Sequence, residues 1–195
     1  MSILSEIMTA NEYFTTHLPK SYSEKKENNE KLPKRHMAIV TCMDTRLVEF
    51  LEPALGVSRG EAKIIKNAGN TVTGTFEATI RSLVVSIFEL GVKEIFVIGH
   101  HDCGVANTNS KELIQKMLER GIAKEAIQMI QSELERWIDD FQDPLQNIQT
   151  VVAKIKTNPL IPKDIAIHGL IFDPKTGKGQ GLLTSEILEQ CGYFM

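Results

Sequence analysis

Sulfur and imidazole side chains follow two short apolar runs that lie far apart in the sequence. Residues 38–40 lead to Cys42, and residues 95–98 lead to His100 and Cys103. In an open parallel sheet the carboxyl ends of the strands share one edge, so these side chains can meet at one site. Zinc binds thiolate sulfur and imidazole nitrogen, and a catalytic zinc ion usually keeps one position open for water. The sequence therefore predicts a zinc site of Cys42, His100 and Cys103, with one zinc ion (Zn2+) per chain.

Two residues close to Cys42 give the predicted site a catalytic character. Asp44 and Arg46 follow it at alternate positions, which allows the guanidinium group of Arg46 to hold the carboxylate of Asp44 through a pair of hydrogen bonds. An ionised carboxylate only accepts hydrogen bonds, so Asp44 is expected to orient the nucleophile at the metal. A zinc ion that only stabilises a fold does not need this pair.

These residues depend on strands that deliver them to a common edge. Apolar runs predict about four parallel strands, and a turn at residues 173–177 predicts a further antiparallel edge strand. The expected strands are residues 36–41, 62–66, 94–98, 165–172 and 179–183, and the expected helices are residues 47–55, 76–88, 127–141 and 144–157. Alternating strands and helices indicate an α/β fold with a mainly parallel β-sheet flanked by helices.

The first part of the chain is expected to form a separate segment. Apolar residues recur at helical spacing after Ser2, a residue type that caps helix N-termini, which predicts an amphipathic helix up to Leu18. Residues 19–35 are mostly Lys, Glu, Asn and Ser, so an exposed connector is expected there. We predict an N-terminal helical arm over residues 1–35 and a single α/β zinc-binding catalytic domain over residues 36–195.

Composition and charge limit the functions that are open to the chain. With 195 residues, of which 42% are hydrophobic, it is long enough to bury one core. A net charge of -3 without a basic stripe argues against a nucleic-acid partner. The apolar runs are shorter than the ~20 residues of a membrane-spanning helix, and the N-terminus lacks the pattern of a secretion signal. Three cysteines do not suggest a disulfide framework, so we predict a cytoplasmic protein with no nucleic-acid and no membrane partner.

Simpler interpretations of the sulfur residues stay open. Cys42 and Cys103 can be ligands of a purely structural zinc, or buried thiols that behave as small apolar side chains. They can also serve thiol redox chemistry, although the Cys-x-x-Cys spacing typical of that chemistry is missing. Cys191 is expected to be a partly buried thiol. A non-catalytic, zinc-stabilised interaction domain is the hypothesis from a different functional class.

Three motifs of the chain resemble those of the β-class carbonic anhydrases. They are Cys42-Met43-Asp44-Thr45-Arg46, Asn67-Ala68-Gly69 and His100-His101-Asp102-Cys103-Gly104. The resemblance covers roughly residues 36–106, with weaker agreement over residues 159–177, and leaves residues 107–157 largely unmatched. Carried over position by position, it implies that Cys42, His100 and Cys103 bind zinc while Asp44 and Arg46 act as a catalytic orienting pair.

The resemblance also implies a reaction and further site residues. Zinc-bound hydroxide, oriented by the Asp44–Arg46 pair, attacks carbon dioxide to give bicarbonate, and a proton is then released. The backbone N–H of Gly69 is expected to hold the second oxygen of Asp44, and Asn67 is expected near the substrate or just behind the site. Apart from the resemblance, His101 is a candidate proton shuttle because it lies next to His100 in the sequence and an unperturbed imidazole titrates near neutral pH. In some family members the aspartate closes on zinc, so Asp44 is a conditional fourth ligand that would make the enzyme inactive at low pH.

Two further expectations concern substrate and assembly. Hydrolysis of a sulfur analogue, carbon disulfide or carbonyl sulfide, on a related fold is an alternative to carbon dioxide hydration. A helix on a polar connector can also place its apolar stripe on a neighbouring subunit, and the resemblance implies the same arrangement. We therefore expect a homodimer or a higher homo-oligomer, with packing of the helix on its own domain as the alternative. The stripe consists of Ile3, Ile7, Phe14 and Leu18.

Overall fold

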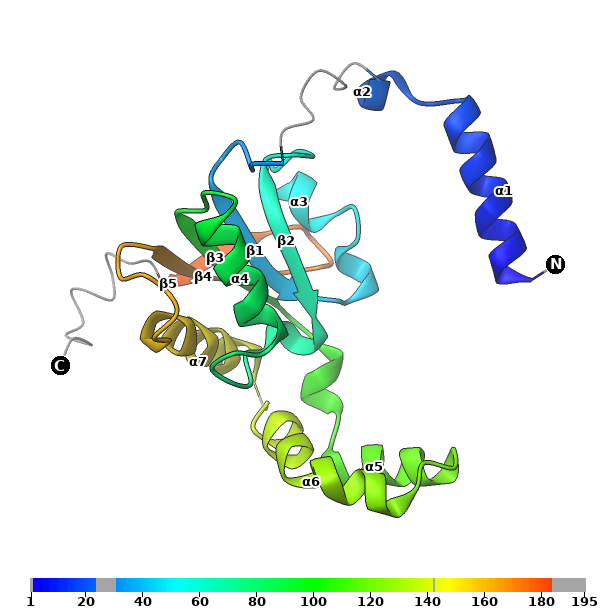
Figure 1. Ribbon diagram of the computed structural model, residues 1–195, viewed down its shortest axis with the longest axis vertical. Coiled ribbons are helices and arrows are strands. Elements are labelled where there is room, and N and C mark those ends of the chain that lie inside the picture. Colours follow the sequence, from blue (N-terminus) through cyan, green and yellow to red (C-terminus); the bar gives the residue numbers. More distant parts are fainter. Residues whose placement is uncertain (1, 24–30, 142, 184–195) are drawn as a thin grey trace. The chain divides into compact units, whose positions relative to one another are not determined.

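A five-stranded sheet dominates the computed structural model, which describes residues 2–23, 31–141 and 143–183 (Figure 1). Within these residues the strand order is β2-β1-β3-β4-β5. The strands are β1 (Met37–Cys42), β2 (Ala62–Asn67), β3 (Glu94–His100), β4 (Ala166–Phe172) and β5 (Gly179–Leu183). The first four are parallel and β5 pairs antiparallel with β4. The predicted α/β fold is thus confirmed, including its antiparallel edge strand.

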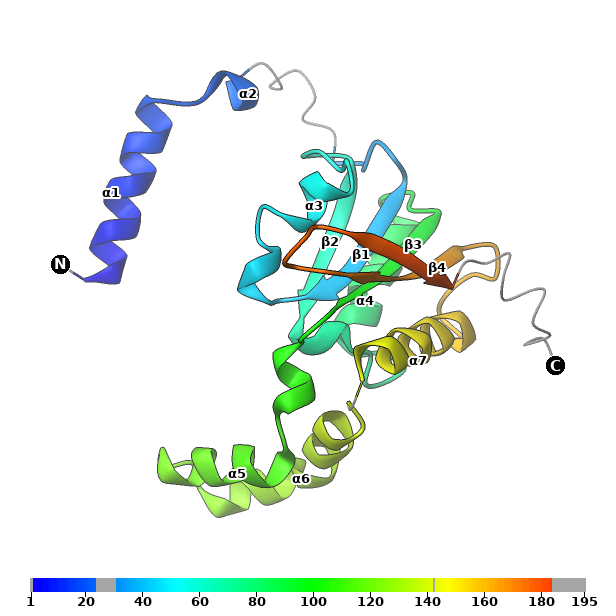
Figure 2. The ribbon, with the colours of Figure 1, turned by 180° about the vertical axis from the view of Figure 1, so that it is seen from behind.

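Helices cover both faces of the sheet. In Figures 1 and 2, α4 (Ala78–Phe88) and α7 (Pro144–Thr157) lie against one face, and α3 (Leu51–Ala54) lies on the opposite face. Successive side chains of a strand point to opposite faces. Accordingly Ala38 and Val40 of β1 join the apolar cluster under α4 and α7, whereas Ile39 joins the cluster on the α3 side. Burial on both faces explains why the β1 sequence is apolar at successive positions.

Short 3-10 turns follow the first three strands at the carboxyl edge of the sheet. They are η1 (Thr45–Leu47) after β1, η2 (Ala68–Asn70) after β2 and η3 (Gly104–Asn107) after β3. The turn η2 begins directly after β2, whereas a few residues separate η1 from β1 and η3 from β3. The residues that the sequence analysis selected for chemistry therefore lie on or beside these turns.

Some helix predictions need correction. The helix expected over residues 47–55 is wrong in its first half, because Glu49 has a positive φ of 55° and only Leu51–Ala54 forms α3. The helix α5 (Ser110–Glu119) was not predicted from the sequence. The helix expected over residues 127–141 is confirmed as α6 (Lys124–Asp139), and α5 and α6 lie side by side in both views (Figures 1 and 2).

The N-terminal residues form a unit of their own. The chain divides into residues 1–31 and 32–195, and the first unit contains α1 (Ile3–Thr16) and α2 (Lys20–Ser23). Ser2 caps α1 by accepting a hydrogen bond from the N–H of Ser5, as predicted, and no residue of α1 is buried. The connector expected over residues 19–35 contains α2, whose residues Lys20 and Tyr22 are exposed. The assignment of one catalytic domain to residues 36–195 stays a prediction.

No helix in the described ranges is both long and apolar enough to cross a membrane. Cys191 lies outside the described residues, so its expected partial burial stays a prediction.

Candidate metal centre

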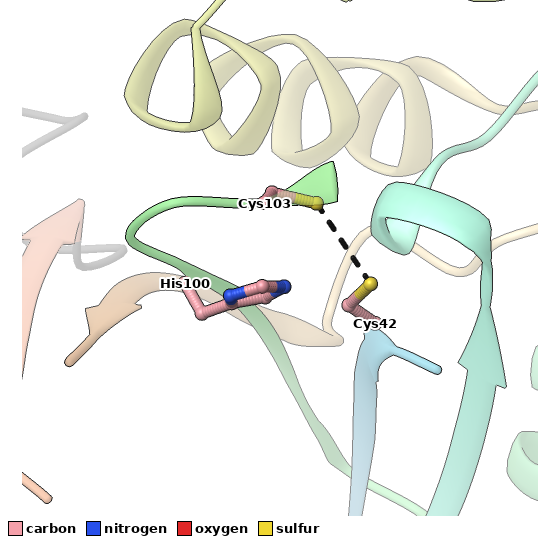
Figure 3. A group of neighbouring side chains, drawn as sticks. All are labelled: Cys42, His100 and Cys103. Atoms are coloured by element: carbon pink, nitrogen blue, oxygen red, sulfur yellow. Dashed lines mark hydrogen bonds between the residues drawn. The ribbon is translucent and has the colours of Figure 1, made fainter. Parts of the chain in front are cut away.

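The ends of β1 and β3 bring the predicted metal ligands together at the carboxyl edge of the sheet. The two strands are adjacent and parallel, with Thr41 paired to Ile98. The ligand atoms of Cys42, His100 and Cys103 all lie within 4.8 Å of one another. Figure 3 shows the imidazole ring directed toward the space beside the two sulfur atoms. These residues form a buried group that is able to hold a metal ion.

His100 is held in the tautomer that a metal ligand requires. Its Nδ1 atom lies 2.9 Å from the carbonyl oxygen of His101, and because a carbonyl only accepts, Nδ1 must carry the proton. The Nε2 atom is buried and has no hydrogen-bond partner among the described residues. Asp44 Oδ2 is 3.7 Å from Nε2, which is beyond hydrogen-bond distance. A buried nitrogen without a partner is costly, and coordination of a cation would satisfy it.

The two sulfur atoms have the spacing of ligands on a tetrahedral ion. Cys42 Sγ and Cys103 Sγ are 3.9 Å apart, and a tetrahedral zinc ion with Zn–S bonds of about 2.3 Å separates two sulfur atoms by about 3.8 Å. The hydrogen bond between them lowers the pKa of Cys42 and raises that of Cys103. Burial is the largest single influence on the pKa of His100 and lowers it, but the neighbouring Cys42 thiol, the carbonyl of His101 and the Asp44 carboxylate together outweigh burial, so the pKa of His100 is raised. Two sulfur atoms at this spacing and one imidazole nitrogen therefore fit zinc, and zinc binding would require Cys103 to release its proton.

Asp44 and Arg46 form the bidentate pair that the sequence predicts. Arg46 donates from Nε to Asp44 Oδ1 at 3.0 Å and from Nη2 to Asp44 Oδ2 at 2.8 Å. The backbone N–H of Arg46 also donates to Oδ1 at 2.9 Å, because Asp44 is the N-cap of η1. These hydrogen bonds lower the pKa of Asp44 to about 2 and raise the pKa of Arg46. Asp44 is therefore ionised and oriented, and its carboxylate faces Arg46.

The turn after β2 contacts Cys42, one of the two sulfur ligands. Asn67 Oδ1 accepts from the N–H of Thr71 at 2.9 Å, and its Nδ2 donates to the carbonyl of Thr71 at 2.8 Å. These bonds shape the turn that carries Gly69, whose backbone N–H forms a hydrogen bond with the Cys42 sulfur and lowers its pKa. The resemblance places this N–H at Asp44 instead, so the contact between Gly69 and Asp44 stays a prediction.

His101 makes structural contacts through its backbone. Its carbonyl fixes the His100 tautomer, and its backbone N–H donates to the carbonyl of Phe172 on β4 at 3.0 Å. The side chain itself is exposed. A role of this ring in proton transfer stays a prediction. Asp102 was not predicted to be a site residue, yet its carboxylate lies 2.9 Å from Arg46 Nη1.

Comparisons with known proteins agree with this geometry. The sequence profile of the family described as carbonic anhydrase matches residues 37–179. The chain is similar to the crystal structure of β-carbonic anhydrase isoform I from Trichomonas vaginalis, with 46% identity, a TM-score of 0.87, and coverage of 94% of this chain and 99% of that one. It is 34% identical to beta-carbonic anhydrase 1 of Mycobacterium tuberculosis over 147 residues, which are 75% of this chain and 81% of the relative. It is also 32% identical to the carbon disulfide hydrolase of Saccharolobus solfataricus over 159 residues, 74% of this chain and 76% of the relative.

Proposed function

The chain belongs to the β-class carbonic anhydrase family, and from this premise we propose that its zinc site and the Asp44–Arg46 pair together hydrate carbon dioxide to bicarbonate and a proton. One observation carries the proposal. A group of Cys42, His100 and Cys103 with ligand atoms within 4.8 Å of one another lies beside a carboxylate that is held by two guanidinium hydrogen bonds. A metal with a purely structural role has no use for such a carboxylate.

Zinc is the metal of this family, and the three ligand residues would hold it here. When bound, zinc supplies a Lewis acid that lowers the pKa of water and stabilises developing negative charge. The protein contributes the ligand geometry. Cys42 and Cys103 provide two anionic sulfur atoms, and His100 provides Nε2 because Nδ1 is engaged with a carbonyl.

Asp44 is proposed to orient the attacking water. Its side chain is 15% exposed, and its Oδ2 atom is 3.7 Å from His100 Nε2, so the carboxylate lies next to the ligand set. Because Arg46 keeps Asp44 ionised, the carboxylate can only accept a hydrogen bond. A water O–H that donates to Asp44 has its lone pair fixed in direction, and positioning of this kind lowers the entropic part of the barrier.

The proton released in each turnover must then reach solvent. His101 is proposed to accept it, because its ring is exposed and belongs to the residue that directly follows the ligand His100 in the chain. Closure of Asp44 on the metal at low pH, as a conditional fourth ligand, is also retained as a proposal. It requires Asp44 to give up its bonds to Arg46.

Stopped-flow measurement of carbon dioxide hydration by the zinc-loaded protein tests the proposal. We expect about one zinc per chain and rapid hydration. A Cys42→Ser, Cys103→Ser double variant should lose both zinc and activity, whereas Cys191→Ser serves as the matched control for replacing a cysteine. Stoichiometric zinc in the double variant, or a zinc-loaded wild-type protein without hydration activity, would refute the assignment.

A sulfur analogue is the second candidate substrate, because the carbon disulfide hydrolase of Saccharolobus solfataricus is a 32% identical relative. Both substrates present an electrophilic carbon between two doubly bonded atoms, so the same site chemistry can serve either. Release of sulfide from carbon disulfide or carbonyl sulfide distinguishes them. A larger kcat/KM for carbon disulfide than for carbon dioxide would reverse the preferred assignment.

We further propose a homodimer or higher homo-oligomer in the cytoplasm. The apolar stripe of α1 has no buried residue in the described structure, and Ile3, Ile7 and Phe14 are 76%, 58% and 42% exposed. Burial of such side chains contributes about 1.5–3 kcal/mol each before ordering costs, so a second subunit is a suitable partner for the stripe. Size determination by light scattering tests the assembly, and a monomer at micromolar concentration would contradict it.

A further inference from the structure

We propose that Asp102 is a positioning residue that fixes Arg46, and through it Asp44, in the orientation needed for hydration. The inference rests on the proposed role of the Asp44–Arg46 pair. It assigns a function to a residue that touches neither the expected metal position nor Asp44 itself, since its contacts with the pair are made to Arg46.

The guanidinium group of Arg46 is held on two sides. Nε and Nη2 donate to the carboxylate of Asp44 at 3.0 and 2.8 Å. Nη1 donates to Asp102 Oδ2 at 2.9 Å, and Nη2 donates to the carbonyl oxygen of Asp102 at 2.7 Å. Four of the five guanidinium N–H groups are thereby used. Because the planar guanidinium group is bound on two sides, it cannot rotate relative to the rest of the side chain without breaking hydrogen bonds.

The backbone of Asp102 is arranged for this double contact. Its φ is +56°, a left-handed conformation that few residues other than glycine adopt, although aspartate and asparagine tolerate it better than most. In this conformation the carbonyl and the carboxylate of the same residue both reach Arg46. A conformation of this kind carries strain and persists where the surroundings impose it, and Asp102 lies between the ligand residues His100 and Cys103.

The contact also joins two separate parts of the site. Arg46 belongs to the turn after β1, and Asp102 belongs to the loop after β3. Side-chain exposure rises outward from Asp44 at 15% to Arg46 at 37% and Asp102 at 65%. Without the Asp102 carboxylate, the guanidinium group of Arg46 can turn toward solvent. The carboxylate of Asp44 then loses the hydrogen bonds that orient it. Asp102 therefore restricts the one member of the pair that packing leaves exposed.

Four variants of the zinc-loaded protein test the proposal through stopped-flow hydration rates and zinc content. Asp102→Ala removes the carboxylate, Asp102→Gly removes it while relaxing the left-handed backbone, and Asp102→Asn keeps an oxygen that accepts from Nη1. Asp164→Ala is the matched control, since this exposed aspartate precedes β4 at the opposite edge of the sheet.

We expect Asp102→Ala and Asp102→Gly to lower kcat about threefold to fivefold, the effect that a partly exposed ion pair supports, with KM and zinc content unchanged. Asp102→Asn should restore most of the rate, and Asp164→Ala should match the wild type. In an Arg46→Ala background, Asp102→Ala should have no further effect on kcat, because its action passes through the missing guanidinium.

The outcomes separate this inference from the function on which it rests. Full activity in Asp102→Ala together with a large loss in Arg46→Ala overturns the role of Asp102 alone. The positioning role of Asp102 is also overturned if the losses in kcat are additive in the Arg46→Ala, Asp102→Ala double variant. Loss of zinc from Asp102→Gly overturns it as well, because it would show a structural effect. Full activity in Arg46→Ala instead overturns the proposed role of the orienting pair.

Discussion

Replacement of Gly69 by alanine tests whether the turn after β2 is as tightly constrained as its geometry indicates. Gly69 has a φ of +73°, and a Cβ atom added to it would lie 2.8 Å from Cε2 and 3.2 Å from Cδ2 of Phe141. Phe141 is only 4% exposed, so its ring has little room to move away. Two separate effects therefore destabilise the variant. One is the strain of alanine in a left-handed backbone conformation, and the other is the close contact of its Cβ with the Phe141 ring.

The magnitude follows from adding these costs. Alanine in a left-handed conformation costs about 1–2 kcal/mol, and an overpacked core contact costs about 1–3 kcal/mol. Alanine also reduces the conformational entropy of the unfolded chain, which returns about 0.4–1 kcal/mol. We expect Gly69→Ala to lower the free energy of unfolding by about 1–4.5 kcal/mol. We also expect it to weaken zinc binding, because the N–H of Gly69 is hydrogen-bonded to the Cys42 sulfur.

Gly60→Ala separates the two costs. Gly60 has a φ of +86°, and a Cβ there would meet no atom within 4 Å, so this control carries the backbone cost without the clash. Urea unfolding, followed by the fluorescence of the single tryptophan, gives both free energies; Trp137 donates to Thr71 beside the same turn. The reasoning is refuted if Gly69→Ala is no more destabilising than Gly60→Ala, or if Phe141→Leu does not relieve part of the difference.

Three further predictions concern the orienting pair, the α5–α6 contact and the N-terminal arm. Asp44→Asn and Arg46→Ala should each retain zinc by metal analysis but lose ~10²-fold in hydration rate by stopped flow, as expected for a positioned acid-base group; full activity in either would remove it from the mechanism. The hydrogen bonds from Ser110 lower the pKa of Asp139, so their stabilising effect is present above the unfolded pKa of about 3.9 and is lost as pH falls toward the lower folded value. Urea unfolding between neutral and acidic pH should therefore show a steeper acid loss in the wild type than in Asp139→Asn, and equal slopes would contradict this. Deletion of residues 1–18 should shift the protein toward monomer in light scattering and lower its activity, whereas a dimeric, fully active truncation would exclude exchange of the arm.

The sequence was most informative where a strand ends in residues with chemical function. Cys42 and His100 each follow a run of apolar residues, and parallel strands place such positions at one edge, so their proximity follows from periodicity and topology alone. The pairing of Asp44 with Arg46 was equally accessible, because both lie in one turn and the contact is local. Neither inference required knowledge of how distant side chains pack.

Contacts between separate loops were harder to predict from the sequence. The interaction of Asp102 with Arg46 spans 56 positions in the sequence, and it depends on a backbone angle that no periodicity encodes. By contrast, α5 was missed although its signal is visible. Asn109 accepts from the N–H of Glu112 at 2.9 Å, and an N-cap residue followed three positions later by glutamate is typical of a helix start. The start of α5 was therefore predictable from the sequence.

The metal ligands and the Asp44–Arg46 pair are packed differently. This difference explains why substitutions near them are expected to have different effects. Cys42 and Cys103 belong to the apolar cluster on the α3 side of the sheet, and a Cβ on Gly99 would lie 2.8 Å from Ile148 of α7, so the chain entering His100 is tightly packed as well. The ligands are therefore fixed by the same contacts that stabilise the fold, and a change there alters both metal binding and stability. Arg46 is held mainly by polar bonds near the surface. Substitutions around it can adjust the direction of Asp44, and with it the rate, while the metal ligands stay in place.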